Sequence, residues 1–499
     1  MLKNNVENNL ENLEKARLSP DLTTNLVNLR SLLNETSDLN VKYAKVADCD
    51  IAVITCEGMV NTAVIAELIY RPLNSLEHSK LTPDEFMSRL GEQILAAVSQ
   101  NDFRTYGELA RFFMSGFALI LADGVDSGMA IAAQGFNTRS VEKPLIHSNM
   151  RGSCEGFTEA LRTNISLVRR RLKSPNFVIK ILQIGETSNT DVALCYMSNK
   201  ADPNMLKQIE EKLEQIPVSL VLEGGFLEPF LQEGSNNFFT QVGTTDRPDN
   251  FSAKLYDGKI GLIVDGTPYA MYLPLLFSEN FQTMDDYSGM SVYSTFCRWL
   301  RYLSFLLTLL LPGLFVAITN FNPEFFPPTI LFNLISAEQK TAFTILSECI
   351  IVMLIYEIMK EAGLRLPSVV GHAVSIIGGL VLGDIVIKVG LISAPIVLVV
   401  AFSAITSFIV PDLYPSISIL RLGFILAGGL FGLFGISALG VVVLLKICSM
   451  SAYGIPYSAP LTPFTLSAMR DYFVRRDWRI LAKNDININE MTGVSKFEP

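Results

Sequence analysis

The chain has 499 residues, of which 49% are hydrophobic and 18% charged, and its net charge at pH 7 is −9. This acidic balance gives no support for nucleic-acid binding, which needs a basic face. The mean hydropathy of +0.34 is high for a soluble enzyme and low for a protein embedded throughout in a membrane. It averages two unlike halves, because the chain is polar up to about residue 280 and long apolar runs follow from Trp299 to Ser449.

The sequence carries no motif for catalysis or for binding a metal or cofactor. Its seven cysteines are scattered and form no C-x-x-C pair, so we interpret them as small hydrophobes rather than disulfides or metal ligands. Three dispersed histidines do not predict a metal site. No phosphate loop, H-E-x-x-H motif or Ser/His/Asp pattern occurs. We therefore predict that the protein is not an enzyme and has no catalytic residue, cofactor or metal.

The polar half begins with an arm and a first lobe. Residues 1–37 are rich in Asn, Glu and Leu and predict a polar N-terminal helical arm. Their start lacks the apolar core of a secretory signal, so we expect the polar half to lie in the cytoplasm. Residues 38–140 predict a first α/β lobe. Its expected elements are strands in 41–58, helices in 61–73 and 83–100, and a hairpin in 117–135.

Residues 141–290 predict a second α/β lobe, because strand and helix patterns again alternate without a long structureless loop. Its expected elements are a helix in 155–173, strands in 176–186 and 191–199, a helix in 203–216, a strand in 218–224 and a closing strand pair within 253–274.

The helix predicted at 155–173 is densely charged. Glu155 and Glu159 lie near its start, and a run of three arginines lies near its end, which suits the helix dipole. A solvated helix explains this pattern, but three consecutive arginines point in different directions and favour acidic partners. We interpret the charged residues of this region as candidates for a subunit or interlobe contact: Arg151, Glu155, Glu159, Arg169, Arg170 and Arg171.

The apolar half predicts a transmembrane helical domain over residues 291–455, followed by a polar C-terminal tail over 456–499. Basic residues before the first apolar run and after the last place both ends in the cytoplasm by the positive-inside rule. Five full spans cannot satisfy that rule, so one run is re-entrant, interfacial or half-crossing. The weakest span is 341–359, which carries Glu348 and Glu357. The five runs are 303–318, 341–359, 368–391, 395–410 and 417–447.

The predicted fold is thus an α/β two-lobed soluble N-terminal domain followed by an all-α multi-pass transmembrane domain. Within its apolar runs, Asp384 and Lys388 stand four residues apart and share one helix face. They form either a self-neutralised pair between helices or part of a polar stripe along an aqueous path. In the second interpretation the stripe also includes Glu348, Glu357 and Arg365.

Two G-x-x-x-G motifs lie in the apolar half. Gly379 and Gly383 form the first, and Gly428 and Gly432 form the second. Small residues at this spacing let helix backbones approach closely. The motifs predict helix packing, either within one chain or between subunits.

Five sequence blocks resemble, in order, the signature blocks of the A subunit of bacterial spore germinant receptors, the GerA family. The blocks occupy 151–173, 244–274, 285–304, 357–383 and 452–463. The resemblance implies a cytoplasmic two-lobed domain on a multi-pass domain in the inner membrane of the spore. It implies a transporter-like B subunit that senses the nutrient and a lipoprotein C subunit as partners. It also implies a homo-oligomeric ring that forms an ion-conducting channel.

One segment departs from the family pattern. Where the family usually has Gly-Gln-Ala-Ala-Val, residues 383–387 read Gly-Asp-Ile-Val-Ile, so a neutral amide is replaced by Asp384. The resulting hypothesis is a membrane subunit of a germinant-gated ion channel that starts spore germination. A non-conducting scaffold for the sensing subunit and a secondary transporter are the alternatives.

Overall fold

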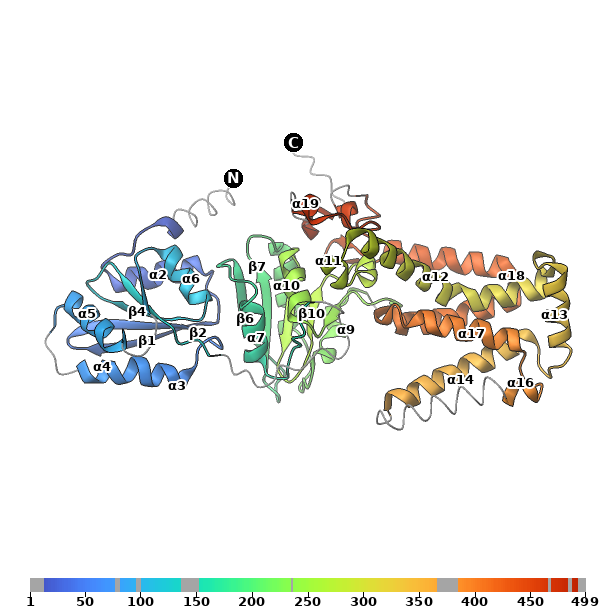
Figure 1. Ribbon diagram of the computed structural model, residues 1–499, viewed down its shortest axis with the longest axis horizontal. Coiled ribbons are helices and arrows are strands. Elements are labelled where there is room, and N and C mark those ends of the chain that lie inside the picture. The colour runs from blue at the N-terminus through green and yellow to red at the C-terminus, as the bar shows by residue number, and fades with distance from the viewer. Residues whose placement is uncertain are drawn as a thin grey trace.

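The computed structural model describes residues 13–76, 81–95, 100–135, 152–234, 237–365, 385–464, 468–482 and 487–491. Two α/β lobes and a helical region follow one another along the long axis of the molecule (Figure 1). The N-terminal α/β part agrees with the predicted class. Four of the predicted site residues lie outside the described residues: Arg151, Gly379, Gly383 and Asp384.

The first lobe contains a five-stranded antiparallel sheet covered by helices on both faces. Its strands pair in the order β1-β2-β4-β5-β3, and a two-residue turn with positive φ at Ala47 and Asp48 closes the β1–β2 hairpin. Helices α2 and α6 pack on one face, and α3, η1, α4 and α5 pack on the other. The elements are α2 (Leu22–Leu32), β1 (Leu39–Val46), β2 (Cys49–Cys56), α3 (Thr62–Ile65), η1 (Ala66–Tyr70), α4 (Arg71–Leu76), α5 (Pro83–Leu95), β3 (Gln100–Phe103), α6 (Tyr106–Met114), β4 (Ala118–Ala122) and β5 (Gly128–Ile131).

The second lobe contains another five-stranded antiparallel sheet, in the order β6-β7-β9-β10-β8. Helices α7 and α10 cover one face, while α8 and α9 cover the other. The strand predicted at 218–224 is wrong, because this segment is irregular and hydrogen-bonds to the loop at 185–190. The fifth strand of the sheet is instead β8. The elements are α7 (Leu161–Arg169), β6 (Phe177–Ile184), β7 (Thr190–Met197), α8 (Pro203–Glu214), η2 (Gly224–Phe226), α9 (Glu228–Leu231), β8 (Gly243–Thr245), α10 (Pro248–Tyr256), β9 (Ile260–Val264) and β10 (Ala270–Leu273).

The two lobes are copies of one structural unit. Both sheets have the same strand order and pairing, and the same local hydrogen bonds recur. Asn25 bonds the backbone of Ser19 in both directions, and Asn164 does the same with Thr158. The aspartate after β4 caps α2, just as Asp265 after β9 caps α7. The first lobe therefore serves as an internal reference for the second.

The helical region begins beside the second lobe and runs away from it (Figure 1). Among the described residues, two helical segments are long and apolar enough to cross a membrane, Ser291–Phe321 and Pro411–Ser449. The elements are η3 (Phe277–Phe281), α11 (Asp285–Ser288), α12 (Ser291–Phe321), η4 (Pro323–Phe325), α13 (Pro328–Glu338), α14 (Ile345–Arg365), α16 (Val386–Lys388), α17 (Ala394–Ser407), η6 (Pro411–Leu413) and α18 (Tyr414–Ser449).

The helix α18 reverses direction at Gly432, so the run expected as one long span at 417–447 is a helical hairpin. Gly432 has φ 63° and ψ −148°, a conformation open essentially to glycine alone. Across the turn, Gly428 lies against Ile436 and Gly423 against Leu439. The two arms, 414–431 and 433–449, are each close to the length needed to cross hydrocarbon.

Replacing Gly432 by alanine is expected to destabilise the protein by about 1–3 kcal/mol, because alanine is strained at this φ and ψ. The added Cβ would also press on the Phe321 ring, 3.1 Å away. Thermal unfolding of the purified protein in nanodiscs measures the loss. Gly440→Ala is the control, since this helical glycine has no neighbour within 4 Å. Equal unfolding temperatures for the two variants would contradict the strained turn.

The chain after α18 returns to the second lobe. The hairpin β11–β12 places the Tyr453 hydroxyl against the Leu231 carbonyl oxygen at 2.6 Å. Within the described part of the predicted polar tail, 456–499, Ile488 and Met491 pack with Ile455 around Leu276. This segment contains β11 (Ser451–Ala452), β12 (Ile455–Pro456), η7 (Ala468–Asp471), α19 (Trp478–Leu481) and η8 (Ile488–Met491).

Candidate functional site

A charged pair lies among the apolar helices. Arg421 on α18 is fully buried, and its Nη2 donates to Glu357 Oε1 on α14 at 2.7 Å. Tyr414 Oη donates to the other Glu357 oxygen at 2.6 Å, and Arg421 Nη1 donates to Ser403 Oγ on α17 at 3.1 Å. One guanidinium thus joins three helices. Charged groups in such surroundings are costly and normally mark a functional interior or a water-filled path.

Glu348, the other predicted carboxylate of α14, lies apart from this pair. It is fully buried, and its Oε2 accepts a hydrogen bond from the Ser393 amide, just before α17, at 2.9 Å. Its Oε1 has no hydrogen-bond partner within the described part of the chain. Since nine residues of helix, or about 13 Å, separate it from Glu357, the two carboxylates do not share one site.

Arg365, another member of the predicted polar stripe, pairs elsewhere. Arg365 is exposed at the end of α14 and pairs with Glu361 one turn earlier at 2.6 Å. Lys388 is exposed on α16. Its predicted partner Asp384 lies outside the described residues, so their pairing stays a prediction.

The predicted packing glycines have two different roles. A Cβ on Gly428 would lie 2.5 Å from the Gly313 carbonyl oxygen, so α18 and α12 approach closely at this point. Gly432 instead forms the turn of the α18 hairpin, because its backbone is not helical. The first G-x-x-x-G motif lies outside the described residues.

The charged helix α7 joins the two lobes. Arg169 Nε and Nη2 donate to the two carboxylate oxygens of Asp38 at 2.8 and 2.9 Å, and both side chains are buried. Beside this pair, the Ser37 amide donates to the Ile179 carbonyl oxygen at 2.8 Å, so the segment before β1 covers the edge strand β6.

Four other predicted residues of this region make contacts within the second lobe. Arg170 and Arg171 both pair with Glu155, whose pKa the two guanidinium groups lower against the opposing effect of burial. The Glu159 carbonyl oxygen accepts a hydrogen bond from the Gly266 amide. The contact of Arg169 with Asp38 joins the two lobes.

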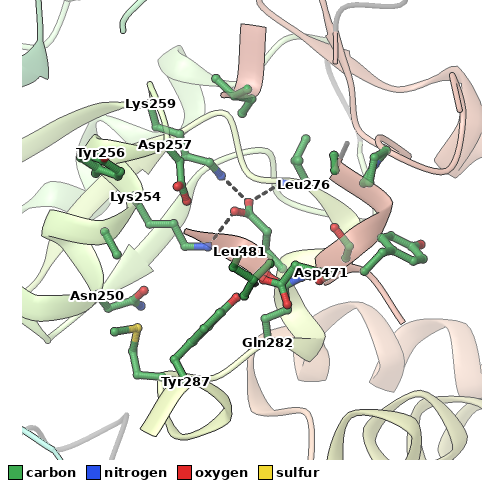
Figure 2. A pocket seen from close by; sticks show the side chains of 18 of the residues that line it. Asn250, Lys254, Tyr256, Asp257, Lys259, Leu276, Gln282, Tyr287, Asp471 and Leu481 are labelled. Atoms are coloured by element: carbon green, nitrogen blue, oxygen red, sulfur yellow. Dashed lines mark hydrogen bonds and ion pairs between the residues drawn. The ribbon is translucent and has the colours of Figure 1, made fainter. Parts of the chain in front are cut away.

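A second charged cluster joins the second lobe to the start of the helical region (Figure 2). Glu279 in η3 accepts from Lys254 Nζ at 2.7 Å and also pairs with Lys259, which donates to the Pro274 carbonyl oxygen. Burial opposes ionisation of Glu279, but the two ammonium groups outweigh it and lower its pKa to about 2. Burial lowers the pKa of Lys259 to about 8.

The start of α12 is tied to the C-terminal segment. Arg298 is fully buried and contacts Asp286 Oδ2 at 3.1 Å and Asp471 Oδ1 at 2.9 Å. The Tyr287 hydroxyl donates to the other Asp471 oxygen, and Arg301 also pairs with Asp286. The base of the helical region, the C-terminal segment and the second lobe therefore form one charged joint.

The environment of Asp257, which lies beside this joint, predicts that the stability of the folded protein depends on pH. Burial raises the pKa of its carboxyl to about 6, although Lys254 and Lys259 oppose the shift. A raised folded-state pKa means that the folded protein loses stability as the pH rises from about 4 to about 6. Asp257→Asn is therefore expected to be more stable than the wild type at pH 7.5 and equally stable at pH 4, in thermal unfolding. Glu211→Gln, at an exposed carboxylate on α8, is the control. A difference between Asp257→Asn and the wild type that does not change with pH would contradict the expectation.

Sequence reasoning missed two fully buried arginines, Arg421 and Arg298. Arg421 interrupts the apolar run 417–447, and this interruption was the available signal. Arg298 was interpreted only as part of a basic cluster that sets orientation. Within the described residues there is no group of three or more metal-ligating His, Cys, Asp or Glu side chains.

Comparisons with known proteins place these features in context. The chain matches the family model described as Bacillus/Clostridium GerA spore germination protein over residues 27–486. It is 33% identical to "Spore germination protein KA" of Bacillus subtilis (strain 168) over 467 residues, 92% of this chain and 85% of that protein. It is 28% identical to "Spore germination protein GerLA" of Bacillus cereus, covering 90% of this chain and 91% of that protein.

The chain also matches solved structures. The crystal structure of the N-terminal domain of the A subunit of the Bacillus megaterium spore germinant receptor GerK3 is 25% identical, with a TM-score of 0.42. The match covers 53% of this chain and 98% of that chain.

Proposed function

Because the chain belongs to the Bacillus/Clostridium GerA family of spore germination proteins, we propose that it is a membrane subunit of a spore nutrient-germinant receptor and that copies of it assemble into a germinant-gated ion channel. The proposal places the helical region in the inner membrane of the spore as a multi-pass domain, with both lobes in the cytoplasm. A transporter-like B subunit and a lipoprotein C subunit complete the proposed receptor.

The partly exposed carboxylate of Glu357 carries this proposal. Arg421 is fully buried, but about a third of the Glu357 side chain (32%) remains exposed in the single chain. Its neighbours on α14 are exposed apolar side chains, with Leu354 50% and Ile358 68% exposed. A carboxylate on such a surface is unsuited to lipid and calls for water or another subunit.

Assembly of identical copies would surround this carboxylate with other subunits and water in place of lipid. In a closed ring, one Glu357 per subunit becomes a ring of carboxylates, which can replace part of the hydration shell of a cation. The bond to Arg421 holds each carboxylate in place.

The ends of the helical region support one orientation. Arg298 near the start of α12 contacts Asp471, which lies beyond the end of α18. Both ends of this region therefore lie on the side of the second lobe. This arrangement agrees with an even number of crossings and with cytoplasmic lobes, as the basic flanking residues predict.

Planar-bilayer recordings test the channel. We expect the purified full-length protein to conduct cations, and Glu357→Gln to lower the cation-to-anion permeability ratio severalfold, because the ring loses its charge. Glu361→Gln is the matched control, since this carboxylate pairs with Arg365 one turn away on the exposed end of the same helix. No conductance from chemically cross-linked oligomers would favour the scaffold. Saturable solute uptake without conductance would favour the transporter.

A further inference from the structure

A cavity of about 510 Å³ lies between α10, η3 and the C-terminal segment. This volume is typical of sites for small ligands. Figure 2 shows Lys254, Lys259 and Asp257 on the side of the second lobe, with Tyr287, Asp471 and Leu481 on the opposite side. The cavity is separate from the Arg421–Glu357 pair and has no part in the proposed conduction.

The first lobe shows that the two lysines are not needed for the fold. Helices α6 and α10 correspond residue by residue, and each is followed by a glycine with positive φ, Gly116 and Gly258. Under this correspondence Lys254 takes the place of Phe112 and Lys259 the place of Phe117. In the first lobe the two phenylalanine rings pack edge to face, with centroids 5.2 Å apart. An apolar pair in one copy is thus a pair of buried ammonium groups in the other.

The ammonium groups retain donors for a further partner. Each ammonium carries three N–H donors. Among the described contacts, Lys254 uses one of them, on Glu279, and Lys259 uses two, on Glu279 and on the Pro274 carbonyl oxygen. Lysines are seldom buried without paired charges. When the nearby Asp257 is protonated, the two cations share one carboxylate, that of Glu279, and this leaves room for a second anion.

The opposite wall of the cavity is mostly apolar, and its carboxylate, Asp471, is already paired with Arg298. The C-terminal segment and η3 supply most of it, and its members are Leu276, Met284, Ala468, Trp478, Leu481, Ile488 and Met491. A molecule with an apolar body and one charged head would bury its body against this wall while its head reached the lysines.

We propose that this cavity binds a small amphipathic carboxylate, with its carboxylate on the Lys254 and Lys259 ammonium groups and its apolar body against the C-terminal segment. The bound molecule would hold η3 and the C-terminal segment together against the second lobe. A small molecule bound at this site would therefore stabilise the charged joint at the start of α12, in addition to the effect of the germinant.

Asp257 makes the binding pH-dependent. Its carboxylate faces the cavity together with Lys254, Lys259 and Glu279, and Lys200 also acts on it. When ionised, Asp257 repels an entering carboxylate; when protonated, it can donate a hydrogen bond to it. Because burial raises the pKa of this carboxyl to about 6, binding is stronger at pH 5.5 than at pH 7.5.

Ligand-observed NMR on the full-length protein in nanodiscs tests the proposal, with empty nanodiscs subtracted. The probes are 3-phenylpropionate, 3-phenylpropanamide and 3-phenylpropylamine, which share one body and differ in head charge. We expect 3-phenylpropionate to bind with a dissociation constant on the order of 1 mM, as suits a ligand of this size. It should bind at least tenfold more tightly than the amide or the amine.

Variants separate binding from folding. Lys254→Met is expected to weaken 3-phenylpropionate binding at least tenfold, and Asp257→Asn to remove its pH dependence. Ala253→Leu fills the cavity without touching the charged cluster, so it should abolish binding and leave thermal unfolding unchanged. Lys207→Met, at an exposed lysine paired with Glu211, is the control and should bind normally. Equal binding of the three probes, or unchanged binding by Ala253→Leu, would overturn the proposal.

Discussion

Replacing Arg421 by methionine is expected to destabilise the folded protein by about 3 kcal/mol, because it leaves the partly exposed Glu357 without its hydrogen-bonded cation. The pair joins α14 to α18, and Arg421 also donates to Ser403 on α17, so all three helices lose a contact. Thermal unfolding in nanodiscs and the yield of folded protein measure the loss. The double variant Arg421→Met with Glu357→Gln should recover most of it, since no lone charge remains.

The matched control for Arg421→Met is Arg365→Met. Arg365 pairs with Glu361 within one helix, and both side chains are largely exposed. Such pairs contribute about 0.3–0.5 kcal/mol, so the unfolding temperature should hardly change. If both variants unfold at the same temperature, the Arg421–Glu357 pair does not hold the helices together.

Replacing Arg169 by methionine is expected to loosen the contact between the two lobes and to destabilise the protein by about 3–5 kcal/mol. The change leaves the Asp38 carboxylate buried among apolar groups, with Thr36 as a remaining donor. Hydrogen exchange of the Ser37 and Ile179 amides should become faster, because these amides bridge the lobes beside the pair. Calorimetry should resolve an earlier transition for one lobe.

Arg162→Met is the control at the same junction. Arg162 pairs with Glu57 across the lobes at 2.9 Å, but both side chains are more than 40% exposed. Water screens this pair, so its loss should change stability by less than about 1 kcal/mol. If Arg169→Met and Arg162→Met destabilise the protein equally, burial of the ion pair does not determine how much it contributes to the contact between the lobes.

The α/β character of the polar half could be predicted because its strands are apolar runs of ordinary strand length. The expected hairpin at 117–135 is found as β4 and β5. The strand expected at 218–224 is not formed, because this segment hydrogen-bonds to the loop at 185–190 and not to a strand of the sheet. The duplication escaped detection because its traces are a few polar residues at turns, such as Asn25 and Asn164, while the core residues differ.

The candidate site was harder to predict. Glu357 and Arg421 are 64 residues apart and meet only through packing of three helices. Gly432 resembles a packing glycine in sequence, because hydropathy does not register a change of backbone direction. Arg298 finds its partners on both sides of the apolar region, at Asp286 and Asp471, a separation that local patterns do not cover.

Both ends of the α18 hairpin contact one short segment of the second lobe, residues 238–241. Ser416 in its first turn bonds the Phe238 carbonyl oxygen, and Ser451 just past its end accepts a bond from Gln241. Each arm of the hairpin is about 26 Å long, measured from these contacts to Gly432. If this stretch tilts by about 10°, the far tip swings sideways by about 4–5 Å, close to one helical pitch. A small tilt of the second lobe would therefore produce its largest displacement at Gly432, the end of the helical region that lies farthest from the lobe.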